Sequence, residues 1–484
     1  MAGWVLTRPA SASITATPED AVITFNGSVV GTGTLTVADL DPGPYPIHVE
    51  RKGFESVDTT VTLKRGKQAQ LDYPLAAMPI PVSVTTHPKG ATCAITLADG
   101  TQLTGTTPYE QPVPAGPIAI SVAAEGYNPF SRELYLDEGF TLDYYLDPEG
   151  QILHGLGTIS TLGAPKGVSI TPDGLEVWAS ILDGPPSIEI FNPRTGDKVG
   201  EVDIGEYGAV EVIFNRAGTL AYTSQMETAK CFEIDVRARK VVREFDTKSA
   251  WTKWVTLSPD EKRLYASNWS GDDVSIIDLT TGALIDRVGV SNTPRGMYAT
   301  ADGKYLYVAG FDSGYLDRID LTNNTMKSVF KDGGALRHIV GDEATGRLFI
   351  SDMLHDVIWV HDMKTGKTTK FTDVDEKPNT IDLSPDGKML FVSCRGENAS
   401  EETYYIPGPE WGTLLVFDTT NGKPLDAVIA GNQPTALDVS ADGKLMVSSD
   451  FLDNRLRVYE VPDYATFAAG GGGRYEEHFD EIEK

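Results

Sequence analysis

One short phrase, a polar turn followed by an apolar run, recurs along the chain from residue 171 onward. Its copies are TPDG at 171–174, NRAG at 215–218, SPDEK at 258–262, TADG at 300–303, DEATG at 342–346, SPDG at 384–387 and SADG at 440–443. Successive copies are 41 to 44 residues apart, except the last, which follows after 56 residues. A repeat of about 40 residues with several short strands is typical of a propeller blade, which must stack on its neighbours to bury both faces. The sequence therefore predicts seven blades around one axis.

The turn residues indicate how each blade is wound. Asp and Gly suit a tight hairpin, because Asp bonds its own backbone and Gly accepts positive φ. The segment 151–160 reads as a strand without a partner in its own repeat. We expect it to supply the outer strand of the last blade and so close the ring without an exposed edge. Residues 464–484 combine a glycine run with acidic residues, and we expect a flexible tail.

Ahead of the repeats, residues 14–75 and 81–147 look like one unit used twice. Gly43 and Gly116 are 73 residues apart, and so are Gly53 and Gly126. Within each unit apolar and polar residues alternate with period two, the pattern of a half-buried strand. The predicted fold class is therefore all-β, with two small β-sandwiches followed by a seven-bladed β-propeller. The expected domains are 1–77, 78–148, 149–463 and the tail 464–484.

Both halves resemble known families. The two small units resemble the PEGA domain in their proline openings at Pro18 and Pro88, in the strands PGPYPIHV and AGPIAISV, and in the KGF and EGY turns. The repeats over about 155–462 resemble the YVTN-type propellers, best in LSPDEKRLYASNWSGDDVSIID and IDLSPDGKMLFVSC. The first resemblance implies a spacer or binding module at the cell envelope. The second implies the fold, in a group that includes periplasmic and surface-layer proteins, lactonases and a lyase.

Charge and composition exclude several functions. The net charge of −28 argues against nucleic acid and against an anionic membrane surface. The three cysteines are far apart and indicate neither a disulfide framework nor zinc. No apolar run approaches the length of a membrane span. The first residues do not form a signal peptide, and together with the PEGA resemblance we expect an extracytoplasmic, mature chain that has lost its signal peptide.

Candidate ligand-binding residues follow from the repeat. The residue about eight positions before each turn glycine falls where the chain enters the innermost strand. In five blades this residue is a candidate for binding an anion: Lys166, Lys253, Arg295, His338 (with Arg337 as the competitor) and Asn379. Three cations and a histidine around one axis would attract an anion in a protein of charge −28. The alternative is that they pair with acidic neighbours and line a watered channel.

An insertion, RGENASEETYYIPGPEWG at 395–412, accounts for the longest spacing. It belongs to the loop between the second and third strands of the sixth blade, on the same face as the axial residues. Long loops with their own aromatics are often functional, so Tyr404, Tyr405 and Trp411 are candidate partner-binding residues. Alternatively the loop is a lid over the basic centre, or a tolerated insertion packed on its neighbour.

Catalysis has little support in the sequence. His338 is a lone axial histidine, which is weak evidence for acid–base chemistry. His355 and His361 lie among aspartates, but at opposite ends of one strand, so neither a metal nor any other cofactor is predicted. The leading hypothesis is a non-enzymatic envelope protein whose propeller binds a protein or glycan partner, or assembles with itself. The alternative is a lyase-like or lactonase-like enzyme, or a small-anion receptor, that uses the basic centre.

Overall fold

The computed structural model describes residues 9–185, 187–400, 403 and 405–484. The chain divides into two compact units, one ending at Leu146 and the other beginning at Asp147. Within the described residues, no helix is both long and apolar enough to cross a membrane.

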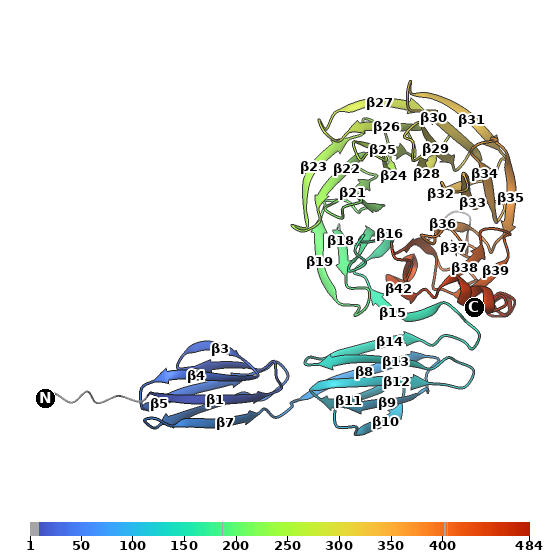
Figure 1. Ribbon diagram of the computed structural model, residues 1–484. Coiled ribbons are helices and arrows are strands. Elements are labelled where there is room, and N and C mark those ends of the chain that lie inside the picture. The colour runs from blue at the N-terminus through green and yellow to red at the C-terminus, as the bar shows by residue number, and fades with distance from the viewer. Residues whose placement is uncertain (1–8, 186, 401–402, 404) are drawn as a thin grey trace. The chain divides into compact units, whose positions relative to one another are not determined.

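The first unit contains two β-sandwiches with the same topology (Figure 1). In the first, a sheet of order β4-β1-β7 faces a sheet of order β3-β2-β5-β6. The strands are β1 (Ala10–Thr17), β2 (Val22–Phe25), β3 (Ser28–Thr32), β4 (Thr34–Leu40), β5 (Gly43–Glu50), β6 (Val57–Leu63) and β7 (Gln68–Pro74).

The second sandwich repeats this order with sheets β11-β8-β14 and β10-β9-β12-β13. Its strands are β8 (Pro79–His87), β9 (Thr92–Leu97), β10 (Gln102–Thr106), β11 (Tyr109–Pro114), β12 (Gly116–Ala123), β13 (Phe130–Leu136) and β14 (Phe140–Tyr145). The equivalent pairs β1/β7 and β8/β14 are both parallel. The inward positions are apolar, as the period-two pattern predicts: Ile23 and Ile47 in one core, Ile95 and Ile120 in the other.

In the described part of the second unit, seven four-stranded antiparallel sheets stand around a ring (Figure 1). The first four are β16 (Ala164–Ile170), β17 (Val177–Asp183), β18 (Ser187–Phe191), β19 (Lys198–Asp203); β20 (Val212–Phe214), β21 (Leu220–Gln225), β22 (Lys230–Asp235), β23 (Lys240–Asp246); β24 (Thr252–Leu257), β25 (Arg263–Asn268), β26 (Asp273–Asp278), β27 (Leu284–Gly289); and β28 (Pro294–Ala299), β29 (Tyr305–Gly310), β30 (Tyr315–Asp320), β31 (Thr325–Lys331).

The remaining three complete the ring. They are β32 (Leu336–Asp342), β33 (Arg347–Asp352), β34 (Val357–Asp362), β35 (Thr368–Asp373); β36 (Pro378–Leu383), β37 (Met389–Cys394), β38 (Thr413–Asp418), β39 (Pro424–Ile429); and β40 (Pro434–Val439), β41 (Leu445–Asp450), β42 (Arg455–Glu460) with β15 (His154–Ser160). The first strand of each blade is innermost, as Figure 1 shows for β16, β24, β28, β32 and β36. The fold class predicted from the repeats is confirmed.

The recurring turns have the predicted chemistry. The Asp302 side chain accepts hydrogen bonds from Thr300 Oγ1 and from the Lys304 N–H, at 2.7 and 3.0 Å. Gly303 adopts a φ of 69°, which a side chain would disfavour. The same arrangement at Asp386 and Gly387 fixes the hairpin of the sixth blade.

The ring is closed by an early segment of the chain. β15 pairs antiparallel with β42, from His154 opposite Glu460 to Ser160 opposite Arg455. Ile159 of β15 joins an apolar cluster with Val168 of the first blade and Val447 of the last. This pairing covers the edge of β42 that would otherwise be open to another strand.

The C-terminal segment differs from the prediction of a flexible tail. It forms α1 (Tyr464–Ala469) and the 3-10 turn η2 (Glu477–Asp480), and the Phe467 side chain is fully buried against the last two blades. The glycine run redirects the chain rather than loosening it. A Cβ at Gly473 would lie 2.2 Å from an Asp426 oxygen, so glycine is required there. Composition alone suggested a linker, whereas a few aromatic side chains anchor the segment.

Candidate binding site at the propeller axis

The five axial candidates lie at the entrances of the innermost strands. Lys166 is in β16, Lys253 in β24, Arg295 in β28, His338 in β32 and Asn379 in β36. At each of these residues the ladder to the second strand of the blade is interrupted. Such a bulge leaves a residue unpaired and re-aims its side chain.

A serine in the second strand of the preceding blade holds several of these bulges in place. Ser267 Oγ donates to the Arg295 carbonyl at 2.9 Å, and Ser224 Oγ donates to the Lys253 carbonyl at 2.7 Å. Ser351 Oγ donates in the same way to the carbonyl of Asn379 at 2.8 Å. The backbone at the axis is therefore fixed from blade to blade.

Arg295 is the most deeply buried of the axial cations, with 2% of its surface exposed. Its Nη2 lies 3.0 Å from Glu211 Oε1. Its Nε and Nη1 are buried and have no hydrogen-bond partner among the residues that the structure describes. The pKa of Glu211 is raised because burial outweighs the nearby arginine charges.

The two lysines rest on aromatic rings. Lys253 Nζ lies 3.5 Å from the centre of the Trp269 ring, and Lys166 Nζ lies 4.7 Å from that of Phe451. Burial, and then the positive charge of Arg295, lower the pKa of Lys253 to about 6. Burial lowers the pKa of Lys166 well below its usual value, and four surrounding cations lower it further.

Two of those cations are Arg337, which the sequence offered as the competitor of His338, and Arg395, which the sequence did not predict as an axial residue. Arg337 Nε donates to Asn379 Oδ1, and Asn379 Nδ2 is buried without a partner among the described residues. Arg395 Nε donates to Gln433 Oε1 at 2.8 Å. Arg337 directly precedes the predicted His338. Glu211 directly follows Val210, which holds the equivalent position in the second blade. Both residues therefore lie one residue away from the positions that the repeat indicates.

His338 lies in the cluster but its ring is held by the backbone. Its Nδ1 is 2.9 Å from the Ile381 carbonyl and 3.1 Å from the Ile381 N–H, and its ring contacts Trp254 at 4.5 Å. Burial, and then Arg295, lower the pKa of His338 to about 3. The ring is therefore neutral at physiological pH and a weak base.

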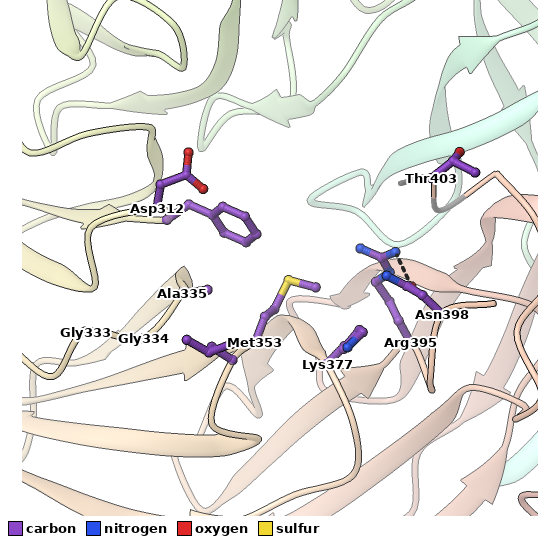
Figure 2. Close-up of a pocket in the computed structure, with 11 residues that line it drawn as sticks. Asp312, Gly333, Gly334, Ala335, Met353, Lys377, Arg395, Asn398 and Thr403 are labelled. Atoms are coloured by element: carbon purple, nitrogen blue, oxygen red, sulfur yellow. Dashed lines mark hydrogen bonds between the residues drawn. The ribbon is translucent and has the colours of Figure 1, made fainter. Parts of the chain in front are cut away.

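A pocket of about 470 Å³ opens beside this cluster (Figure 2). It lies on the loop-bearing face, by which we mean the face of the propeller that carries the loops between the second and third strands of the blades, including the insertion at 395–412. The residues that line it come from the loops of the fourth, fifth and sixth blades: Phe311, Asp312, Gly333, Gly334, Ala335, Met353, Leu354, Lys377, Arg395, Asn398 and Thr403. Figure 2 shows the Arg395 guanidinium beside Asn398, to which its Nη2 donates at 3.1 Å. Arg395 also lowers the pKa of Lys166, and Asp312 raises that of Lys253, so the pocket and the axial cluster are in electrostatic contact.

The predicted partner-binding aromatics behave differently from one another. Tyr404 lies outside the described residues. Tyr405 is 47% exposed, and its ring lies 5.7 Å from that of Phe451. The backbone N–H of Trp411 donates to the Ile482 carbonyl at 2.8 Å, and Lys484 Nζ lies 4.7 Å from the centre of the Trp411 ring. The C-terminal segment thus packs against Trp411, whereas Tyr405 remains exposed at the surface.

Within the described residues, one cluster has the composition of a metal site. Single ligand atoms of Asp332, Asp352 and His355 lie within 4.8 Å of one another. However, the Asp352 carboxylate accepts hydrogen bonds from the Ala335 N–H at 2.9 Å and from Trp359 Nε1 at 3.1 Å. These bonds give Asp352 a structural role within the fifth blade. His361 is absent from this group and contacts Thr368 Oγ1 instead.

Two β-sandwiches joined to a seven-bladed propeller with a basic axis define a modular propeller protein. Residues 10–78 and 80–149 match the model of the PEGA domain, which confirms that part of the predicted resemblance. The chain is 37% identical over 325 residues to "Antigen Lp49" of Leptospira interrogans serogroup Icterohaemorrhagiae serovar copenhageni. The match covers 65% of this chain and 71% of that antigen, and the chain belongs to the same family.

Two further similarities concern the propeller. Over 42 residues, 8% of this chain and 11% of the other, the chain is 57% identical to "Seven-bladed beta-propeller protein Rv1057" of Mycobacterium tuberculosis. The solved structure titled "Kuenenia stuttgartiensis Hydrazine Synthase" is similar with a TM-score of 0.52, 17% identity, and coverage of 62% of this chain and 96% of that chain. At this identity the likeness concerns the fold alone.

Proposed function

We propose that the protein is a non-enzymatic, extracytoplasmic binding protein of the cell envelope. In this proposal the loop-bearing face of the propeller binds a partner protein, and the PEGA domains act as spacer or docking modules. The observation that carries it is the pocket of about 470 Å³ between the loops of three blades. The PEGA domains and the relationship to a protein named as an antigen support a place at the envelope.

The surface around the pocket favours a protein partner over a glycan. Leu354 is 61% exposed at the pocket wall, and Ile406 and Tyr405 are exposed in the insertion. Apolar side chains gathered at a concave site are typical of protein contacts. Exposed tyrosines are also frequent anchors of protein interfaces.

The axial residues favour binding over catalysis. A lyase-like mechanism needs a general base with a pKa near the working pH, whereas burial and the neighbouring arginines lower the pKa of His338 to about 3. Its Nδ1 is also engaged with the backbone of Ile381. His338 therefore suits a structural role at the axis.

The test compares three purified full-length proteins by crosslinking to envelope proteins and mass spectrometry. They are the unaltered chain, the double variant Leu354→Ala/Tyr405→Ala, and the control Leu175→Ala, which alters an exposed leucine beside a hairpin turn on the opposite face. We expect one protein to be enriched by the first and third and at least tenfold less by the second. Equal enrichment by all three, or a glycan or a second copy of the chain as the specific ligand, would contradict the proposal. Protease accessibility on intact cells tests the extracytoplasmic location.

A further inference from the structure

We propose that the propeller axis binds a small oxyanion, a carboxylate or a phosphate-like group, with the Arg295 guanidinium as its direct ligand. This site is distinct from the protein-binding surface proposed above, because it lies at the entrances of the innermost strands and requires no macromolecular partner.

The first argument is the unsatisfied hydrogen-bonding capacity of Arg295. Buried polar groups almost always have a partner, and an exception points to a water or an ion that belongs there. Arg295 is 2% exposed; its Nη2 lies 3.0 Å from Glu211 Oε1, and its guanidinium carbon lies 5.3 Å from the centre of the Trp254 ring. Nε and Nη1 have no acceptor anywhere in the described chain. Asn379 Nδ2, on a nearby inner strand, is a third buried donor in the same condition.

The second argument is the electrostatic setting, which favours an anion over water. Three arginines from the fourth, fifth and sixth blades, Arg295, Arg337 and Arg395, converge closely enough for all of them to lower the pKa of Lys166. Arginine keeps its proton in proteins, so this positive potential persists at every physiological pH. In a buried, low-dielectric site such a potential binds an oxyanion more strongly than neutral water.

The third argument is the geometry of the backbone around the site. Arg295 lies in an interruption of the ladder between Pro294 and Met297, and Ser267 of the preceding blade holds its carbonyl. Glu211 fixes one end of the guanidinium. The donor set is therefore positioned before a ligand arrives, which lowers the entropic cost of binding. We expect the anion to enter by way of the neighbouring pocket, whose wall includes Arg395 and Asp312.

The experiment is isothermal titration of the full chain with succinate, citrate, phosphate and sulfate, each at the same ionic strength set with sodium chloride. The test variant is Arg295→Lys, which keeps the charge beside Glu211 but removes the guanidinium donors. The matched control is Arg237→Lys, at an exposed turn between β22 and β23. We expect one oxyanion to bind per chain of the unaltered protein and of the control. We expect the Arg295→Lys variant to bind the same oxyanion at least tenfold more weakly.

Each outcome is decisive. Preference for succinate and citrate would identify the ligand as a carboxylate, and preference for phosphate and sulfate would identify a tetrahedral anion. Either result supports the site when the Arg295→Lys change weakens it. If none of the oxyanions binds above the chloride background, water satisfies Arg295 and the proposal is wrong. If Arg295→Lys binds as well as the control, the anion sits elsewhere and the assignment is wrong. Protein-partner capture by Arg295→Lys separates this site from the function proposed above.

Discussion

Lys253 shows how the amino group of one buried lysine is tolerated at the axis. Its usual pKa of 10.5 falls to about 6 because of burial and the nearby arginines. Between pH 10.5 and 6 the unfolded chain therefore binds a proton that the folded protein does not. This difference lowers the free energy of unfolding progressively as the pH falls through that window.

The change Lys253→Met should accordingly stabilise the protein at neutral pH, because methionine keeps the apolar contact with Trp269 and cannot bind a proton. We expect its melting temperature to exceed that of the unaltered protein at pH 7, and the gain to shrink toward pH 10. Differential scanning fluorimetry across this range measures the effect. Lys240→Met, at an exposed position on the outer strand β23, is the control. A gain that is constant with pH would mean that Lys253 is protonated in the folded state.

Ser267 links two blades through a single hydrogen bond to the Arg295 carbonyl. Removing a buried donor leaves the carbonyl without its partner, at a cost of about 1–3 kcal/mol. Ser267→Ala should therefore lower the propeller's free energy of unfolding by this amount in urea titrations. Ser270→Ala, in the exposed turn between β25 and β26 of the same blade, should have no comparable effect. An equal loss in both variants would show that the inter-blade bond contributes little.

At the scale of single elements, a buried histidine adds an ion pair to the aromatic contacts that hold the C-terminal segment. His478 Nε2 lies 3.0 Å from Asp375 Oδ2, and Thr413 Oγ1 donates to the same oxygen at 2.5 Å. Burial opposes the charged imidazolium, but the contacts with Asp375, the Tyr475 carbonyl and Glu481 together raise the pKa of His478 above its usual 6.5.

A group with a raised pKa in the folded state stabilises it fully below the unfolded value and loses that effect as the pH rises through the folded value. Hydrogen exchange in residues 475–484, corrected for intrinsic rates, should therefore accelerate between pH 6 and pH 9. His478→Gln, which can still hydrogen-bond but cannot become charged, should remove this pH dependence. Exchange that is equally slow at both pH values in the unaltered protein would contradict the ion pair.

At the scale of the whole molecule, the pairing of β15 with β42 determines whether the ring is complete. A chain that begins at Asp147 keeps β15, whereas one that begins at Thr161 leaves the edge of β42 and the apolar side chains around Val168 uncovered. We expect residues 147–484 to be monomeric in light scattering and residues 161–484 to aggregate or unfold. Two equally soluble monomers would show that the outer strand is dispensable.

The repeat of the turn was sufficient to predict the blades, and the 73-residue offset predicted the paired sandwiches, because both follow from local patterns that the backbone must obey. The repeat of the turn also predicted, to within one residue, which side chains stand at the entrances of the innermost strands. Glu211 and Arg395 were missed as site residues, and the choice between Arg337 and His338 stayed open, because the proximity of these side chains arises from the closure of the ring and from bulges, which no single repeat reveals. The C-terminal segment was misjudged because the anchoring by Phe467 depends on the distant surface of two blades.

The closing strand also sets the order of folding during synthesis. A ribosome delivers residues 154–160 about 300 residues before their partners 455–460, while each sandwich pairs strands that are close in sequence. The sandwiches can therefore fold early. In the propeller, β15 stays unpaired until the last blade has been synthesised. Pairing between strands so far apart in sequence slows folding, and it leaves strand edges unpaired and prone to aggregation in the meantime. Chaperone dependence in this protein should consequently be concentrated in the propeller, in the interval before the final blade is made.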